Sequence, residues 1–243
     1  AQMPPLSPLT PFLLQRDQLL LPGAPPLTLH RICFDAAAFT PACFAAHDMA
    51  LPASLQRAAP KRLGEFLAGR LAAREALRPF GLAGKGVAIG SAREPLWPAG
   101  MEGSISHSQL AGLGVALCGV RPAEGGMGLD LEAWLGPEQG NQLWPGIVDE
   151  DEWGRLEAGA RALGLDRARG LTLVFSAKES LFKALHPRVG RYFDFLDARW
   201  LGMTAQSLTL ELKVPLTPTL PAGWRCTLHW QPLPGGVLTT LLL

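Results

Sequence analysis

Two short segments place carboxylates and a lysine at spacings that suit phosphate chemistry. In residues 175–183 (FSAKESLFK), Glu179 and Lys183 are four apart, so on a helix they lie one turn apart on the same side. In residues 128–132 (GLDLE), Asp130 and Glu132 are two apart, so on a strand both side chains point to one face. Three carboxylates and a lysine suit a site where a divalent cation grips a phosphate.

Simpler interpretations exist for each segment. The helix could carry only a surface ion pair, worth a few tenths of a kcal/mol, and the strand could be an edge strand with two solvated acids. However, two carboxylates on a strand that enters the core are costly unless something neutralises them. Oxygen ligands and a few waters suit Mg²⁺, so Asp130, Glu132 and Glu179 are candidate metal ligands, with Mn²⁺ as a possible substitute.

A second group of residues suits an anion. Residues 103–108 (GSISHS) predict a strand end that runs into a turn of small residues, where Ser106 and His107 can donate to a phosphate. Arg62 and Arg70 are eight apart on a predicted helix, within a quarter turn of each other. They predict an arginine-lined pocket for a terminal phosphate. The alternatives are a structural histidine and a solvated helix face.

Composition limits the function classes. The chain has 243 residues, of which 48% are apolar, so it can bury a substantial core. Lys plus Arg total 22 against 21 for Asp plus Glu, which argues against a nucleic-acid-coating protein. The four cysteines are scattered, as in a reduced cytoplasmic protein. No apolar run is long enough to span a bilayer, and the first residues do not resemble a signal peptide.

The pattern of elements predicts an α+β (α/β) fold in two similar halves. Each half reads as a strand, a short helix, a long helix and three or four strands, after an extended arm over residues 1–26. The long helices are expected near 53–78, interrupted at Pro60, and over 167–185. A turn at 121–126 separates the predicted domains 1–124 and 125–243. A cleft between two such halves is a favoured ligand site.

Together these pieces resemble the 4′-phosphopantetheinyl transferases of the surfactin- and enterobactin-synthetase-activating type. That family's G-[IV]-D-x-E signature is matched by residues 128–132, with Leu129 at the Ile/Val position, and its [FW]-S-x-K-E-[AS]-x-x-K signature by residues 175–183. Upstream blocks at 61–70, 93–98 and 103–107 follow in family order. The resemblance covers about residues 57–190. It implies a fold of two subdomains related by a pseudo-twofold axis, with the active site in the cleft between them.

The resemblance also implies a reaction and roles for residues. The family transfers the phosphopantetheine arm of coenzyme A to a serine of an acyl or peptidyl carrier protein and leaves 3′,5′-ADP. By resemblance, Asp130, Glu132 and Glu179 hold Mg²⁺ and Lys183 steadies the leaving charge. The implied coenzyme A contacts are His107 and Lys183 at the pyrophosphate, Arg62, Arg70 and Ser106 at the 3′-phosphate and nucleotide end, Arg93 near the adenine, and Lys178.

Several alternatives stay open. Glu179 or a metal-bound water can serve as the base for the attacking serine. A metal-dependent phosphodiesterase would use the same carboxylates on coenzyme A, and a non-catalytic carrier-binding module would lack metal ligands. The resemblance implies a cytoplasmic monomer that acts in fatty acid, siderophore or nonribosomal peptide synthesis.

Overall fold

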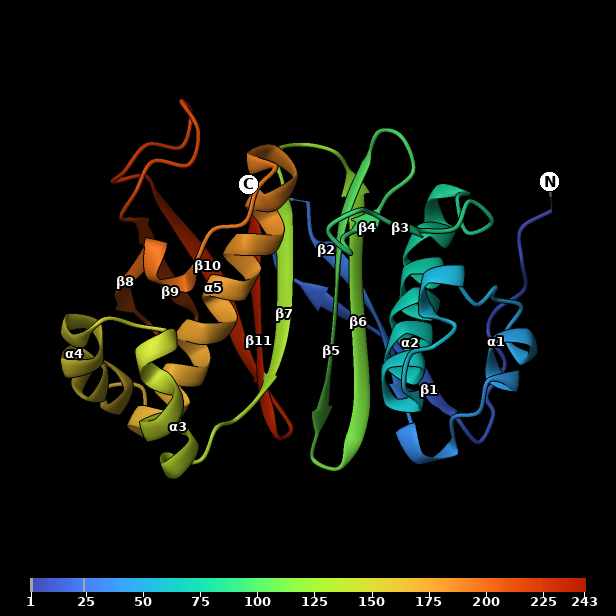
Figure 1. Ribbon diagram of the computed structural model, residues 1–243, viewed down its shortest axis with the longest axis horizontal. Coiled ribbons are helices and arrows are strands. Elements are labelled where there is room, and N and C mark those ends of the chain that lie inside the picture. The colour runs from blue at the N-terminus through green and yellow to red at the C-terminus, as the bar shows by residue number, and fades with distance from the viewer. Residues whose placement is uncertain (1, 24) are drawn as a thin grey trace. The chain divides into compact units, whose positions relative to one another are not determined.

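The computed structural model describes residues 2–23 and 25–243, and the chain divides into two compact units, Ala1–Glu124 and Gly125–Leu243. Each unit combines an antiparallel sheet with a long helix, which is the mixed α+β architecture that the sequence predicts (Figure 1). Within the described residues, no helix is long and apolar enough to cross a membrane. The resemblance implies that the first part binds the nucleotide end of coenzyme A and that the second part carries the metal ligands, and both roles remain predictions.

Unit 1 is a four-stranded sheet covered on one face by helix α2 (Pro60–Leu77). The sheet runs in the order β1-β2-β6-β5, and a short hairpin of two further strands lies outside it. The remaining elements are β1 (Leu13–Leu21), β2 (Leu27–Phe34), η1 (Ala36–Ala38), α1 (Ala42–Ala46), η2 (Ala53–Leu55), η3 (Arg78–Phe80), β3 (Ala88–Ile89), β4 (Pro95–Leu96), β5 (Met101–Leu110) and β6 (Leu113–Pro122).

Helix α2 begins at Pro60, whereas the sequence pattern predicted a helix from residue 53 with an interruption there. Proline has no N–H to donate and its fixed φ suits the first helical position, so it starts a helix rather than breaking one. Residues 53–55 form a separate 3₁₀ turn, η2. Leu63, Leu67 and Leu71 of α2 are buried against the sheet, as their spacing indicates.

Part of the arm expected over residues 1–26 forms regular structure. Residues 13–21 form edge strand β1, whose alternation is blurred because most of its side chains are exposed or half-buried. Before β1, two arginines of the α2–η3 region hold the chain in place. Arg74 Nη2 donates to Ser7 Oγ at 2.8 Å, and Arg78 Nη1 donates to the carbonyl of Pro4 at 2.5 Å.

Unit 2 is a five-stranded antiparallel sheet in the order β7-β11-β10-β9-β8, with α5 (Arg167–Val189) across one face. Helix α3 was not expected, because its segment is rich in glycine and proline. The sequence pattern also predicts a strand near residues 192–200, whereas β8 begins at Ala198. The elements are β7 (Met127–Ala133), α3 (Pro137–Leu143), η4 (Trp144–Gly146), α4 (Glu150–Arg161), η5 (Phe195–Asp197), β8 (Ala198–Met203), β9 (Ser207–Leu212), β10 (Arg225–Leu233) and β11 (Gly236–Leu242).

Helix α5 has clear start and stop signals. Asp166 accepts a hydrogen bond from the N–H of Arg169 at 2.8 Å, which caps the first turn. Gly190 ends the helix with φ of +71°, a left-handed conformation that glycine adopts without strain. The helix therefore extends about one turn past the end at residue 185 that the apolar stripe indicated.

The contact between α5 and β7 leaves no room for a side chain at Gly128. A Cβ atom built there would lie 2.0 Å from the carbonyl oxygen of Ser180. The absence of a side chain at this position therefore lets helix backbone and strand backbone approach directly, two residues before Asp130.

We predict that Gly128→Ala lowers the free energy of unfolding by at least about 2 kcal/mol, because the added methyl group meets backbone that cannot rotate away. Gly154→Ala is the control. Gly154 is inside α4 with open space around its Cα, so alanine there should raise stability by about 0.5–1 kcal/mol. Denaturant unfolding of both variants checks the prediction, and equal stability of Gly128→Ala and wild type would contradict it.

Candidate active site

Strand β7 and helix α5 bring the predicted acidic residues of unit 2 into one electrostatic cluster. Asp130 is only 4% exposed, and its Oδ1 accepts a hydrogen bond from Lys183 Nζ at 3.1 Å. The same ammonium group donates to the carbonyl of Leu129 at 3.0 Å. Asp130 Oδ2 is buried and has no hydrogen-bond partner within the described residues. One oxygen of this carboxylate is thus paired with a lysine while the other lacks a donor.

The charge in this cluster is unbalanced. Burial and the nearby carboxylates of Asp130 and Glu179 raise the pKa of Glu132 to about 9, against a smaller lowering effect of Lys183. Burial and Asp130 also raise the pKa of Glu179, with Lys183 again opposing. The raised pKa values mean that the carboxyl groups of Glu132 and Glu179 resist ionisation when only protein charges surround them.

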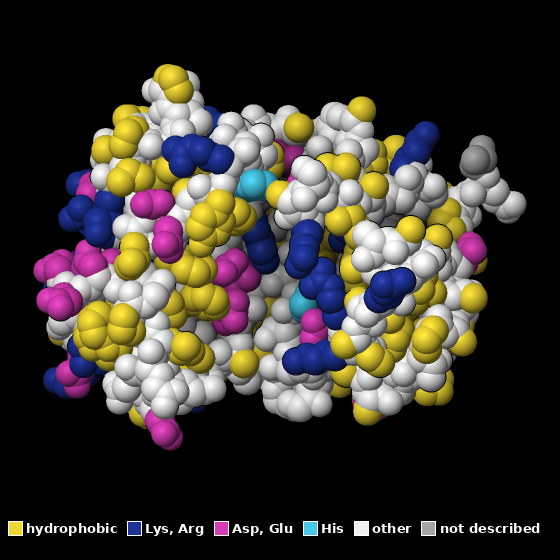
Figure 2. Space-filling view, viewed as in Figure 1, with side chains coloured by type: hydrophobic (Ala, Val, Ile, Leu, Met, Phe, Trp, Pro, Cys, Tyr) yellow, Lys and Arg dark blue, Asp and Glu magenta, His cyan; other side chains and the backbone are white. Residues whose placement is uncertain are grey.

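A divalent cation would supply the missing positive charge. Among the described residues, no three acidic, histidine or cysteine side chains already form a group that could hold a metal ion. The chemistry of the donors nevertheless fits one: hard oxygen atoms, a buried carboxylate oxygen without a donor, and two carboxyl groups with raised pKa values. Acidic side chains gather over α5 and β7 in Figure 2.

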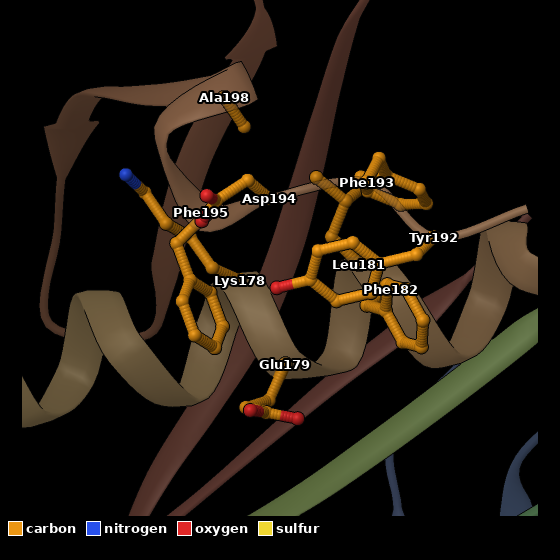
Figure 3. A pocket seen from close by; sticks show the side chains of 9 residues that line it. All are labelled: Lys178, Glu179, Leu181, Phe182, Tyr192, Phe193, Asp194, Phe195 and Ala198. Atoms are coloured by element: carbon orange, nitrogen blue, oxygen red, sulfur yellow. The ribbon is translucent and has the colours of Figure 1, made fainter. Parts of the chain in front are cut away.

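Lys178 is not part of this cluster. It leaves α5 in a different direction from Glu179, as Figure 3 shows. Its ammonium group donates to the carbonyl of Ile147 at 2.7 Å and pairs with Glu152 Oε2 at 3.2 Å. Lys178 is 2% exposed and Glu152 is fully buried. These contacts indicate that Lys178 stabilises the fold and does not bind coenzyme A, whereas the resemblance implied that it does.

Glu152 is a residue that the sequence patterns did not single out. Its carboxylate accepts hydrogen bonds from the N–H of Asp149 at 3.0 Å and the N–H of Trp200 at 2.9 Å, besides its ion pair with Lys178. It thereby joins the start of α4 to strand β8 and to α5. The capping pattern Asp149-x-x-Glu152 is visible in the sequence, but it indicates a helix start and not a buried charge.

A pocket of about 260 Å³ lies on α5 beside Glu179. Figure 3 shows the rings of Phe182, Tyr192 and Phe193 on one side of it, the ring of Phe195 on the other side, and the carboxylate of Glu179 at its edge. The pocket is largely apolar, and its lining residues are Lys178, Glu179, Leu181, Phe182, Tyr192, Phe193, Asp194, Phe195 and Ala198.

In unit 1, helix α2 presents the two predicted arginines differently. Arg62 is exposed. Arg70 is half-buried: its guanidinium lies 4.6 Å from the centre of the Phe66 ring, and Nε donates to the carbonyl of Val87 at 2.9 Å. Burial lowers the pKa of Arg70 to about 10, so the side chain stays charged at neutral pH. Figure 2 shows basic side chains gathered near a histidine on the visible face of this unit.

Ser106 and His107 lie inside strand β5, which continues to Leu110. The turn that the sequence predicted at this point is therefore absent. His107 Nδ1 lies 3.7 Å from Glu65 Oε2 of α2, so His107 is on the sheet face that α2 covers. Side chains alternate along a strand, which puts Ser106 on the opposite face. His107 thus shares a face with α2 and its arginines, whereas the Ser106 side chain does not.

Arg93 lies in the tight connection between β3 and β4. It is exposed and has φ of +65°, a strained conformation for a residue with a side chain. Its N–H donates to the carbonyl of Gly90 at 3.0 Å, which closes the turn. A surface pocket of about 440 Å³ adjoins this hairpin and is lined by Leu82, Lys85, Gly86, Ala88, Leu96, Trp97, Pro98 and Ala99.

We predict that Lys178→Met lowers the free energy of unfolding by about 3–5 kcal/mol, because it leaves the buried Glu152 carboxylate without its partner. The double variant Lys178→Met, Glu152→Gln should lose less than the sum of the two single losses, since neither charge is then left alone. Denaturant unfolding of all three proteins measures this coupling. Additive losses in the free energy of unfolding would show that Lys178 and Glu152 do not stabilise each other.

Comparison with known proteins agrees with the two signatures. Residues 51–117 match a family model described as the 4′-phosphopantetheinyl transferase N-terminal domain, and residues 126–232 match that of the 4′-phosphopantetheinyl transferase superfamily. The chain is 42% identical over 208 residues to enterobactin synthase component D of Escherichia coli (strain K12), which covers 84% of this chain and 87% of that protein.

Two further relatives come from other organisms. Enterobactin synthase component D of Salmonella typhimurium is 36% identical over 195 residues, 79% of this chain and 76% of that protein. The 4′-phosphopantetheinyl transferase Svp of Streptomyces mobaraensis is 36% identical over 167 residues, 67% of this chain and 64% of that protein. With both signatures present and relatives matched over most of their length, this chain belongs to the 4′-phosphopantetheinyl transferase superfamily and is a transferase enzyme.

Proposed function

We propose that this enzyme transfers the 4′-phosphopantetheine arm of coenzyme A to a serine hydroxyl of an acyl or peptidyl carrier protein. The serine oxygen forms a bond to the phosphorus that carries pantetheine, the P–O bond to the second phosphate breaks, and 3′,5′-ADP leaves. The observation that carries the proposal is the pairing of Lys183 with Asp130 beside Glu132 and Glu179, in a chain of this superfamily.

We assign Asp130, Glu132 and Glu179 as the residues that hold a Mg²⁺ ion, with Mn²⁺ able to replace it. The ion supplies positive charge to the pyrophosphate when it is bound. Lys183 adds a second positive charge from the protein, at a side chain that is 28% exposed and already oriented by Asp130 and the Leu129 carbonyl. Oriented charges of this kind stabilise the charge that develops on a leaving phosphate.

Glu179 is our candidate for the base that takes the proton of the attacking serine. A bound cation would oppose the raised pKa that burial and Asp130 give this carboxyl, so its position beside the pocket, rather than its basicity, supports this role. It lines the pocket of Figure 3, whose aromatic wall offers an apolar contact to a partner that approaches α5. Lys178 has no role in this proposal, because its ammonium group forms a buried ion pair with Glu152 inside unit 2.

For unit 1 we assign Arg62 and Arg70 to the 3′-phosphate and His107 to the pyrophosphate. A guanidinium binds a phosphate through two parallel N–H donors, which suits a terminal dianion. Arg70 uses Nε and Nη2 on the carbonyls of Val87 and Ala88, which orients the rest of its guanidinium. We place Arg93 near the adenine and leave Ser106 out of the 3′-phosphate site, because its side chain points to the other sheet face.

Intact-mass measurement of an apo carrier protein, incubated with coenzyme A, Mg²⁺ and the enzyme, tests the reaction. We expect the carrier to gain one phosphopantetheine and 3′,5′-ADP to appear in equal amount. Asp130→Ala should lower turnover at least ~100-fold, since a charged ligand is lost where charge develops, and a chelator should abolish transfer. Coenzyme A cleaved equally fast without a carrier would favour the phosphodiesterase alternative, and carrier binding without mass gain the non-catalytic module.

A second prediction concerns the 3′-phosphate. Arg62→Ala should weaken the binding of coenzyme A by about 1.5–3 kcal/mol, roughly 10- to 150-fold in Kd, and leave the Kd of 3′-dephospho-coenzyme A nearly unchanged. Calorimetry with both ligands measures the difference. Arg225→Ala, which removes an exposed arginine paired with Glu211 in unit 2, controls for the general loss of charge. Equal losses for the two ligands would show that Arg62 does not contact the 3′-phosphate.

A further inference from the structure

Helix α5 presents a row of buried hydroxyl groups to the sheet of unit 2. Thr172, Ser176 and Ser180 are spaced by four residues, so they lie on one side of the helix, and each is at most 1% exposed. Thr172 Oγ1 donates to the carbonyl of Ala168 at 2.8 Å and accepts from the N–H of Leu135 at 3.0 Å. Its two neighbours in the row bind β11 instead.

Thr239 of β11 connects Ser176 to Ser180. Its Oγ1 lies 2.9 Å from Ser176 Oγ and 2.7 Å from Ser180 Oγ, and Ser180 Oγ also donates to the carbonyl of Thr239 at 3.2 Å. Thr239 is fully buried. The three hydroxyls have one proton each: Thr239 can donate to Ser180, Ser180 to the carbonyl of Thr239, and Ser176 either to Thr239 or to the carbonyl of Asp130, 3.3 Å away.

The hydroxyl network lies next to the residues of the candidate active site. Thr239 is the direct partner of Asp130 in the antiparallel pairing of β11 with β7, so both side chains point toward α5. On the helix, Ser176 and Ser180 flank Glu179. The hydroxyl network therefore connects the strand that supplies Asp130 and Glu132 to the helix turn that supplies Glu179 and Lys183.

We propose that Thr239 is a positioning residue for the active site, which fixes the register of α5 on β7 and so the distance between Glu179 and the carboxylates of Asp130 and Glu132. The inference rests on the proposed function, because it explains how those carboxylates are brought together. Residue 239 lies beyond the region that matches the superfamily model, which ends at residue 232.

The chain offers a matched control next to Thr239. Thr240 is also buried, at 3% exposure, but it points to the other sheet face, and its hydroxyl has no hydrogen-bond partner in the described part of the chain. Valine has nearly the shape of threonine without the hydroxyl. Thr239→Val and Thr240→Val thus remove one hydroxyl each from adjacent buried positions, while Thr239→Ser keeps the hydroxyl and removes a methyl group.

The test measures carrier modification at saturating carrier, the KM for coenzyme A, the MgCl2 concentration at half-maximal rate, and the rise in Tm on adding MgCl2 with coenzyme A. For Thr239→Val we expect kcat to fall about tenfold, since small displacements of reacting groups are costly. The MgCl2 midpoint should rise several-fold, the Tm shift should shrink, and the KM for coenzyme A should change less than about twofold. Thr239→Ser should recover most of the wild-type kcat, and Thr240→Val should match wild type.

The inference is overturned if Thr239→Val lowers Tm but keeps the wild-type kcat, MgCl2 midpoint and MgCl2-induced Tm shift, which is the result that a purely structural hydroxyl would give. It is also overturned if Thr240→Val lowers kcat as much. If Thr239→Val does not fold, Ser176→Ala breaks the same network from the helix side and is judged by the same measurements. Failure of the wild-type enzyme to modify any carrier would instead reject the proposed function.

Discussion

The candidate active site depends on the direct contact of α5 with β7. Carboxylates on a strand and on a helix share a site only if the two backbones come close, and side chains between them normally prevent this. Here Gly128 has no side chain where the Ser180 carbonyl approaches, and the small side chain of Ser176 donates a hydrogen bond to the carbonyl of Asp130. The buried hydroxyls of Ser176, Ser180 and Thr239 are hydrogen-bonded to one another, which avoids the penalty of about 1–3 kcal/mol for each unpaired polar group.

The two sides of α5 differ in charge balance: one carries a neutralised ion pair, and the other an excess of carboxyl groups. Lys178 and Glu152 form a buried pair whose remaining hydrogen-bonding positions are filled by backbone groups, so that charge is neutralised inside the fold. Burial lowers the pKa of Lys178, and its pairing with Glu152 opposes this effect. On the other side, Lys183 faces three carboxylates and cannot neutralise them. A divalent cation would balance the excess negative charge of these carboxylates, and the cation and the oriented lysine together would bind a polyphosphate.

The sequence predicted the helices and strands whose spacing of apolar residues marks a buried face. It missed those whose formation depends on contacts with distant parts of the chain. The stripe on α5 and the alternation in β7 gave the positions of Glu179, Lys183, Asp130 and Glu132 on their elements. Strand β1 was missed because an edge strand with mixed exposure shows no clean alternation. The turn predicted after Ser106 was wrong because small polar residues also fit a strand, so their composition could not decide between the two.

The nine-residue segment 175–183 shows why a motif cannot be divided into roles by sequence alone. Lys178 and Lys183 are the same residue type on one helix, yet five residues correspond to a rotation of about 500°, or 140° net, which sends the two ammonium groups to different surroundings. One meets Glu152 in the interior and the other meets Asp130 at the site. Ser176 and Ser180, also within the segment, are fully buried and bind Thr239, some 60 residues later in the chain. A signature of this kind therefore combines groups that we assign to the chemistry with groups that place the helix, and only their partners in the fold separate the two.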